Sequence, residues 1–215
     1  MTEILDLWPT RLLKKSLDGH ADHNPGLLKL IRGWEKDNRN LTTDYRDNNP
    51  FEIDSEPTNW LRSGVNGAVV DYLKACAIGY GVDWQIMGWA NVNRMGDYHD
   101  PHNHPHCYLS GTYYVKMPKT GGGQGSSRKR NDPGRNDRRP SRITFYDPRP
   151  AFNMNAIAGD PYIEAEHTVD PEPGLLMLWP AQLIHFVHPN LADETRVSIS
   201  FNIILKNVAD YLPDQ

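Results

Sequence analysis

Four of the nine histidines of the chain lie within one short stretch, HDPHNHPH, at residues 99–106. In this stretch His102, His104 and His106 are spaced two residues apart. On a β-strand, side chains two apart lie on the same face, with Cα atoms about 6.5–7 Å from each other. Two imidazoles at that separation can bind one ion, and imidazole suits zinc, copper, iron and nickel. The stretch therefore predicts a transition-metal site.

A third ligand must come from elsewhere in the chain, and the segment LLMLWPAQLIHFVHPN contains His185 and His188. These two histidines are three residues apart, so on a regular strand they point to opposite faces and at most one can reach the metal. His188, which is followed by a proline, is expected at the surface or behind the ligands. Three further histidines are expected to be structural or exposed: His20, His23 and His167.

The last apolar segment of the chain alternates with a period of two, which is typical of a strand with two different faces. The polar face consists of Arg196, Ser198, Ser200 and Asn202. The other face consists of Val197, Ile199, Phe201 and Ile203. Such an apolar face must be buried, so the polar face lines either solvent or an internal cavity. An arginine beside two serines favours a cavity that binds an anion.

The elements that position these residues are predicted as helices followed by strands. Apolar residues at helical spacing predict helices at Leu5–Leu17, Pro25–Lys36 and Thr58–Ala77. Short β-rich segments separated by turn-forming residues predict strands near 84–93, 107–117, 142–146, 175–179, 184–188 and 195–205. Several short strands after a helical region favour a mainly β fold with N-terminal helices, in the form of a sandwich, a jelly roll or a closed barrel.

Composition limits the classes of protein to which the chain can belong. A chain of 215 residues with 38% apolar and 23% charged residues can bury one core, so a single domain, 1–215, is expected. A net charge of -4 gives no reason to expect a nucleic-acid or membrane partner. No signal peptide or membrane-spanning segment is expected. Two cysteines without a CxxC motif suit a cytoplasmic protein and argue against a thiolate zinc site.

Residues 119–140, KTGGGQGSSRKRNDPGRNDRRP, contain no large apolar side chain and many basic ones. This composition predicts a flexible basic insertion at the surface between two strands. A second interpretation is a basic lid that recruits an anionic substrate or covers the site, because long loops beside sites are often functional.

Five motifs in a fixed order resemble the 2-oxoglutarate/Fe(II)-dependent oxygenases, and within them the 2OG-Fe(II) oxygenase group related to prolyl hydroxylases. The motifs are His-x-His, SGTYYV, DPR at 147–149, GLLMLWP-x4-H-x-V and RVSISFN. The resemblance covers roughly residues 84–206. It implies a double-stranded β-helix, or jelly roll, over 84–206 with 1–83 as a helical N-terminal support. It also implies that the cofactors are Fe(II) and 2-oxoglutarate.

The resemblance implies a role for particular residues. The metal ligands would be His102, His104 and His185, and 2-oxoglutarate would be bound by Arg196, Ser198 and Tyr114. The cavity wall would include Trp89, Asn91, Tyr108 and Trp179. The implied reaction hydroxylates a C–H of a protein, peptide or small molecule with O2, and releases succinate and CO2.

Position 104 departs from the pattern of the superfamily, whose usual iron site has two histidines and one carboxylate. Three neutral imidazoles could hold the iron, or Asp97 or Asp100 could supply an oxygen ligand, or the pair could be His104 and His106. A cupin-type dioxygenase or isomerase would also use three histidines without 2-oxoglutarate, but it would leave the Arg-x-Ser strand unexplained. The oligomeric state and the substrate are not predicted.

Overall fold

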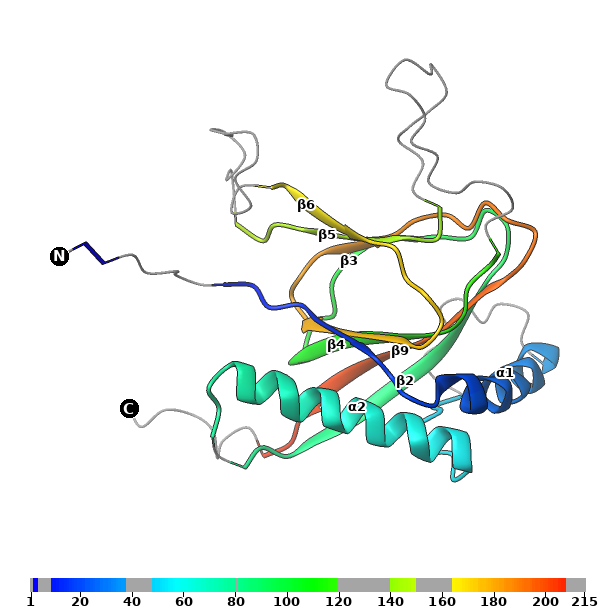
Figure 1. The fold of residues 1–215 in the computed structure, drawn as a ribbon, viewed down its shortest axis with the longest axis horizontal. Coiled ribbons are helices and arrows are strands. Elements are labelled where there is room, and N and C mark those ends of the chain that lie inside the picture. The colour runs from blue at the N-terminus through cyan, green and yellow to red at the C-terminus, as the bar shows by residue number, and fades with distance from the viewer. Residues whose placement is uncertain are drawn as a thin grey trace, which may run out of the picture.

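The structure is a computed structural model that describes residues 2–3, 9–37, 48–79, 81–119, 140–149 and 164–207. Two helices pack beneath two layers of strands (Figure 1). The helices are α1 (His20–Asp37) and α2 (Glu56–Ala75). The strands are β1 (Leu13–Ser16), β2 (Trp84–Asn93), β3 (His99–His102), β4 (Leu109–Lys116), β5 (Ile143–Tyr146), β6 (Glu166–Val169), β7 (Leu175–Pro180), β8 (His185–Val187) and β9 (Arg196–Leu205).

The strands form two antiparallel sheets that face each other. The major sheet has five strands in the order β1-β7-β4-β9-β2, and the minor sheet has four in the order β3-β8-β5-β6. Most strands adjacent in sequence therefore fall in different sheets, as β7 and β8 do, and the chain winds from one sheet to the other, although β5 and β6 pair within the minor sheet. This arrangement is the double-stranded β-helix, or jelly roll, expected from the sequence.

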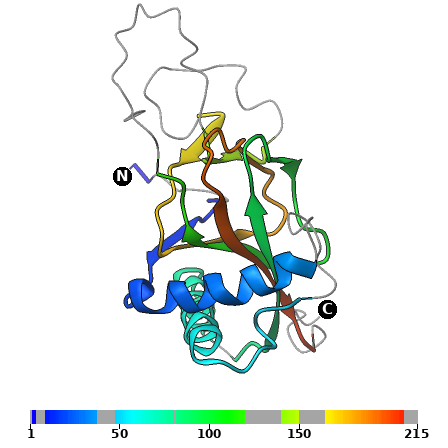
Figure 2. The ribbon, with the colours of Figure 1, turned by 90° about the vertical axis from the view of Figure 1, so that its right-hand side faces the viewer.

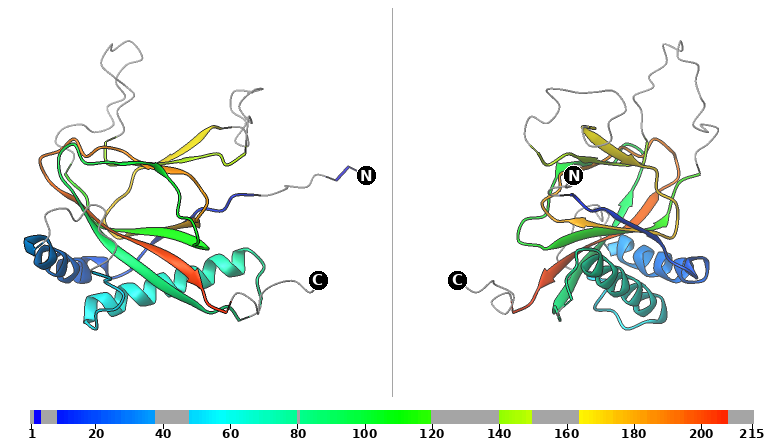
Figure 3. Two further views of the ribbon diagram at one scale, coloured as in Figure 1. Left: turned by 180° about the vertical axis from the view of Figure 1, so that it is seen from behind. Right: turned by 60° about the vertical axis from the view of Figure 1, so that its left-hand side comes forward.

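Both helices cover the outer face of the major sheet, on the side away from the minor sheet (Figures 2 and 3). Helix α2 presents Leu61, Val65 and Val69 at every fourth position, and all three are fully buried. They belong to one cluster with the apolar face of β9, which includes Ile199 and Phe201. The helices thus bury the apolar side of the major sheet and leave its other side for the space between the sheets.

The space between the sheets contains a second apolar cluster and, directly beside it, a polar cavity. The cluster includes Tyr114, Phe145, Met177 and Trp179. Because the side chains of β9 alternate, residues 196, 198 and 200 line the cavity while their neighbours pack under the helices. The prediction that this strand has one buried apolar face and one cavity face is confirmed.

The N-terminal prediction of a helix over Leu5–Leu17 is wrong where the structure describes it. Residues Leu13–Ser16 form β1, an edge strand paired with β7 in the register Leu13↔Leu178. Pairing with an existing sheet edge stabilises extended backbone, and it overrides a weak helical pattern over so few residues. The first part of the predicted helix, 5–8, lies outside the described residues.

The other predicted elements agree with the structure to within a few residues, while the short strands β3 and β6 were missed. Most of the basic insertion, 120–139, lies outside the described residues. In the part of the chain that the structure describes, no helix combines the length and apolarity that a membrane crossing requires.

Candidate metal centre

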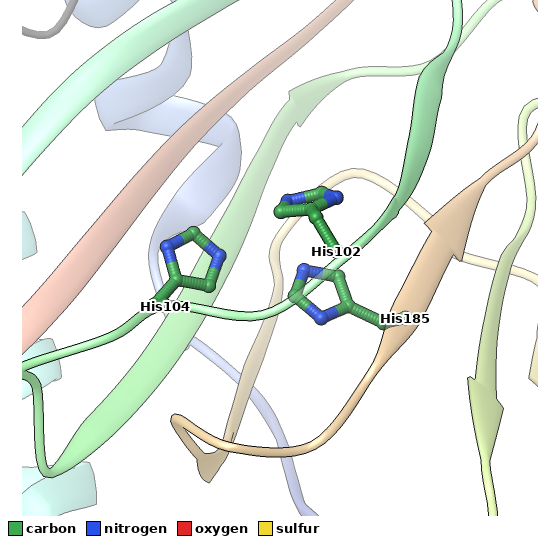
Figure 4. Close-up of side chains that lie close together, drawn as sticks. All are labelled: His102, His104 and His185. Carbon is green, nitrogen blue, oxygen red and sulfur yellow. The ribbon is translucent and has the colours of Figure 1, made fainter.

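Three histidines from separate parts of the chain converge in the cavity between the sheets. His102 ends β3, His104 lies in the connection to β4, and His185 begins β8. One nitrogen of each ring lies within 4.8 Å of one nitrogen of each of the other two. Figure 4 shows the rings gathered around one point. Such an arrangement can hold one transition-metal ion.

The backbone brings these histidines together by a different route from the one predicted. His102 and His185 are opposite each other in the β3–β8 pairing. His104 is not on a strand, and its N–H donates to the carbonyl of Ala181 at 2.9 Å. The strand assumed to run from the histidines into β4 is therefore interrupted, with exposed His106 at a positive φ of 65°. The prediction that alternation along one strand places the pair is wrong, although the pair itself is in the cluster.

The open question about the ligand set can be answered from the geometry. His106 is not part of the cluster. Among the described residues, the cluster is the one group of three or more ligand-type side chains with metal-site spacing, and it contains no carboxylate. Asp100 is exposed, and its carbonyl rather than its carboxylate accepts a bond of 2.6 Å from Nδ1 of His102. The geometry therefore supports three imidazoles.

Hydrogen bonds fix which ring nitrogen of two of these histidines is free. Nδ1 of His102 bonds to a carbonyl oxygen, and Nδ1 of His185 bonds to the carbonyl of Leu183 at 3.0 Å. A carbonyl can only accept, so each Nδ1 carries the proton and each Nε2 keeps its lone pair. This is the usual way in which proteins orient metal-binding histidines.

Burial keeps His104 and His185 in the neutral form that binds metals. Desolvation, and then the neighbouring His102, lower the pKa of His185 to about 3 and that of His104 to about 4. The rings are enclosed by aromatic side chains, since Trp179 lies 4.9 Å from His185 and Trp89 lies 5.9 Å from His104 between ring centroids. Protons therefore do not compete with a metal for these nitrogens near neutral pH.

Arg196 lies in the same cavity, 2% exposed, with part of its guanidinium unpaired. Its Nη2 donates to Oδ1 of Asn93 at 2.8 Å. Its Nε and Nη1 are buried without a partner. Desolvation lowers the pKa of this guanidinium below its usual value, but arginine stays charged in proteins. A buried cation with two free donors fits the carboxylate of a ligand.

The other predicted cavity residues are mostly in place. Ser198 and Tyr114 line the cavity with Arg196, as do Trp89, Asn91 and Trp179. Burial raises the pKa of Tyr114 to about 12, so its hydroxyl stays a donor. The prediction for Tyr108 is wrong: it precedes β4, where strand alternation does not yet apply, and it packs against the helix-side core.

Sequence reasoning missed His99 and Asn93. His99 lines the cavity, and Asn93 lies buried on β2 directly opposite Arg196. The period-two series Asn91, Asn93 on the predicted strand 84–93 was the available signal. His188, predicted to lie outside the ligand set, is not in the cluster, and its Nε2 lies 2.7 Å from Oγ1 of Thr144.

The residues present fit Fe(II) and a dicarboxylate. Three neutral imidazoles suit a transition metal, and four buried polar atoms without partners belong to residues that line the cavity. These atoms are Nε and Nη1 of Arg196, Nε1 of Trp179 and Oδ1 of Asn91. Buried polar groups are normally hydrogen-bonded, so this concentration marks a place for a polar ligand.

Comparison with known proteins agrees with this assignment. Residues 87–202, more than half of the chain, match the model of a family described as "Putative 2OG-Fe(II) oxygenase". No curated protein matches the sequence.

Solved structures with the same fold share little sequence with the chain. A prolyl-4-hydroxylase of Pseudomonas putida is 13% identical with a TM-score of 0.56, and the alignment covers 91% of this chain and 88% of that one. A Trichoplax adhaerens prolyl hydroxylase, solved with a peptide of hypoxia inducible factor, is 13% identical with a TM-score of 0.58, covering 95% and 87%. HygX of Streptomyces hygroscopicus, solved with nickel and 2-oxoglutarate, is 10% identical with a TM-score of 0.53, covering 90% and 81%.

Proposed function

The chain belongs to the 2OG-Fe(II) oxygenase family, and we propose that it hydroxylates a C–H bond of a peptide, protein or small molecule, with O2 as the oxidant and succinate and CO2 as co-products. Membership of this family makes it an Fe(II)- and 2-oxoglutarate-dependent enzyme. One observation carries the proposal: three imidazoles and an arginine with two unpaired donors open into one buried cavity.

The proposed iron ligands are His102, His104 and His185. His102 and His104 come from one segment and His185 from a distant one, so the site forms only when β3 and β8 pair and the residues after β3 are held by the Ala181 carbonyl. The carbonyls that accept from Nδ1 of His102 and His185 hold these two rings in the orientation that offers Nε2. When bound, Fe(II) supplies the oxidative chemistry, which couples decarboxylation of 2-oxoglutarate to oxidation of the substrate.

The proposed residues for the far carboxylate of 2-oxoglutarate are Arg196, Ser198 and Tyr114. Two of the guanidinium nitrogens are unpaired, and one edge of the group can present a parallel pair of N–H groups, which matches the two oxygens of a carboxylate. Tyr114 keeps its proton and can donate, because its pKa is raised to about 12. Burial of all three side chains excludes water from the ligand and strengthens these bonds.

The charge of the cavity favours a neutral or acidic substrate. Among the residues that the structure describes, none of those lining the cavity is an aspartate or a glutamate. Fe(II) on three neutral imidazoles balances the two charges of 2-oxoglutarate, so Arg196 leaves the loaded cavity with a net positive charge. A cationic group of a substrate would be repelled at short range in this low-dielectric space. A neutral peptide or aliphatic group, or an acidic one, would not be.

The test is a spectroscopic titration without oxygen. We expect 2-oxoglutarate added to the anaerobic Fe(II)-loaded protein to produce a weak visible charge-transfer band, because the ligand chelates the metal directly. Succinate, which lacks the 2-oxo group, is the control and should produce none. Absence of the band, with unchanged 2-oxoglutarate affinity in Arg196→Ala, would favour the cupin-type alternative, which uses three histidines alone.

The remaining sequence predictions stay proposals. The single-domain organisation over 1–215 is consistent with β1 and both helices packing on the major sheet. A cytoplasmic location rests on the two cysteines, Cys76 and Cys107, which are both unpaired.

A further inference from the structure

We infer that Asn93 is a positioning residue that sets the orientation of the Arg196 guanidinium, and that His99 holds the Asn93 amide in the orientation required. The inference rests on the proposed function, in which Arg196 binds the far carboxylate of 2-oxoglutarate. It adds two residues, neither a metal ligand, that decide how well this dicarboxylate is distinguished from other 2-oxo acids.

Asn93 contacts both neighbours through its side-chain amide. It is fully buried on β2, opposite Arg196 in the β2–β9 pairing. Its Oδ1 accepts from Nη2 of Arg196 at 2.8 Å, and its Nδ2 lies 3.3 Å from Nε2 of His99. His99 and Arg196 line the cavity, and Asn93 lies buried behind them and contacts both.

The chemistry of arginine determines which atom donates and which accepts in each of these contacts. A guanidinium has donors only, so the atom of Asn93 that faces it must be the oxygen. The amide nitrogen must then face His99 and donate, because an amide NH₂ cannot accept. Nε2 of His99 is therefore the acceptor. Burial and the neighbouring Arg196 lower the pKa of His99 to about 4, which agrees with an unprotonated Nε2.

The backbone of Asn93 is also held in place. Nδ2 of Asn190 donates to the Asn93 carbonyl at 3.1 Å and to the Glu194 carbonyl at 2.8 Å. This bond ties β2 to the turn that leads into β9. The backbone of Asn93 is thus fixed by pairing and by Asn190, and its side chain is fixed by His99.

A fixed Asn93 determines which edge of Arg196 is available. The guanidinium is planar, and its Nη2 engages Asn93 through one of two N–H bonds, so Nε–H and Nη1–H, which lie on opposite edges, stay unpaired. The second N–H of Nη2 is parallel to one of these two, on the edge that Asn93 leaves open, and such a pair matches a carboxylate. Without the Asn93 oxygen, Nη2 would be unpaired and the guanidinium could turn. Ordering the guanidinium on ligand binding would then reduce the binding free energy.

The experiment compares two ligands that differ in one group. Protein loaded with Mn(II) is titrated calorimetrically with 2-oxoglutarate and with 2-oxobutyrate, a 2-oxo acid that lacks the far carboxylate. In Asn93→Ala we expect affinity for 2-oxoglutarate to fall about tenfold or more, while affinity for 2-oxobutyrate changes less than twofold. The matched control is Asn24→Ala, which removes a buried, doubly hydrogen-bonded asparagine outside the cavity. It should leave both affinities unchanged.

A double variant distinguishes a loss of Arg196 positioning from a general disturbance of the folded structure. In an Arg196→Met background, Asn93→Ala should have no further effect on 2-oxoglutarate affinity, because the group it positions is gone. Additive losses, or equal losses for both ligands in Asn93→Ala, would overturn the inference. If Asn93→Ala does not fold, His99→Phe carries the same test, with a smaller but equally selective loss expected. A wild-type protein that does not prefer 2-oxoglutarate to 2-oxobutyrate would instead refute the proposed function, and the inference with it.

Discussion

Replacing Arg196 by methionine should remove binding of 2-oxoglutarate without unfolding the protein. Two buried N–H donors of this residue are free for the ligand. A hydrogen bond to a charged group contributes about 1.5–3 kcal/mol. A carboxylate on one edge of the guanidinium accepts two such bonds, which do not add fully, so we take about 3 kcal/mol in total. This corresponds to a dissociation constant about 150-fold higher.

The same substitution has opposing effects on the ligand-free protein. Removing a guanidinium that is 2% exposed relieves a desolvation penalty of several kcal/mol. It also leaves Oδ1 of Asn93 without its donor, which costs about 1–3 kcal/mol. Methionine fills similar space with apolar atoms. We therefore expect the free energy of unfolding of the ligand-free variant to stay within about 2 kcal/mol of the wild type.

Denaturant unfolding of the Mn(II)-loaded protein with and without 2-oxoglutarate measures both effects. At a ligand concentration 100-fold above the wild-type dissociation constant, the wild type gains about 2.7 kcal/mol. The variant, with its 150-fold weaker binding, should gain only about 0.3 kcal/mol. At one and the same concentration of 2-oxobutyrate, the wild type and the variant should be stabilised equally. If 2-oxoglutarate stabilises Arg196→Met as strongly as the wild type, Arg196 does not bind the far carboxylate.

Three further outcomes follow from the structure. His185→Ala should abolish tight binding of Mn(II) or Co(II) measured by calorimetry, whereas His106→Ala, at an exposed position outside the cluster, should leave it intact; equal losses would refute the ligand set. The pKa of His185 is lowered to about 3, and those of two other cavity histidines to about 4, so unfolding takes up protons below the unfolded pKa of about 6.5. The metal-free protein should therefore lose stability as the pH falls from 6.5 towards 4, and an unfolding midpoint independent of pH over this range would contradict the burial of these rings. Gly111→Ala should destabilise the protein by several kcal/mol in urea unfolding, because the added Cβ would lie 2.4 Å from the Phe201 ring. Gly67→Ala in helix α2, where the added Cβ meets nothing within 4 Å, should instead gain about 0.5–1 kcal/mol.

Much of the fold could be predicted because the alternation of apolar and polar residues along a strand shows which of its faces is buried. Strand β2 was predicted over its full length, 84–93, and β9 to within one residue. Both carry long stretches in which one face packs on the helices. Strands β3 and β6 were missed because their sequences, HDPH and EHTV, contain few of the apolar and β-branched residues by which strands are recognised. Strand β1 was mistaken for a helix because its pairing with β7 is a tertiary contact.

The site was predictable in its residue types but not in its connections. The spacing of His102 and His104 suggested convergence, and they do converge, through a turn rather than along a strand. The role of Asn93 depends on register, because it faces Arg196 only if residue 93 is paired with residue 196. A sequence without known pairing does not contain that information. Given the register, the alternation of Asn91 and Asn93 would have placed both in the cavity.

The register that positions the site is held by the opposite face of the same strand. On β9 four apolar side chains pack in the helix-side core: Val197, Ile199, Phe201 and Ile203. Burying each stabilises the fold by about 1.5–3 kcal/mol, so together they favour this register by about 6–12 kcal/mol. A slip of one residue would expose them to the polar cavity and place Arg196 against the apolar side of the helices. The buried guanidinium therefore need not stabilise its own position, because apolar packing on the other face of β9 holds it in the cavity.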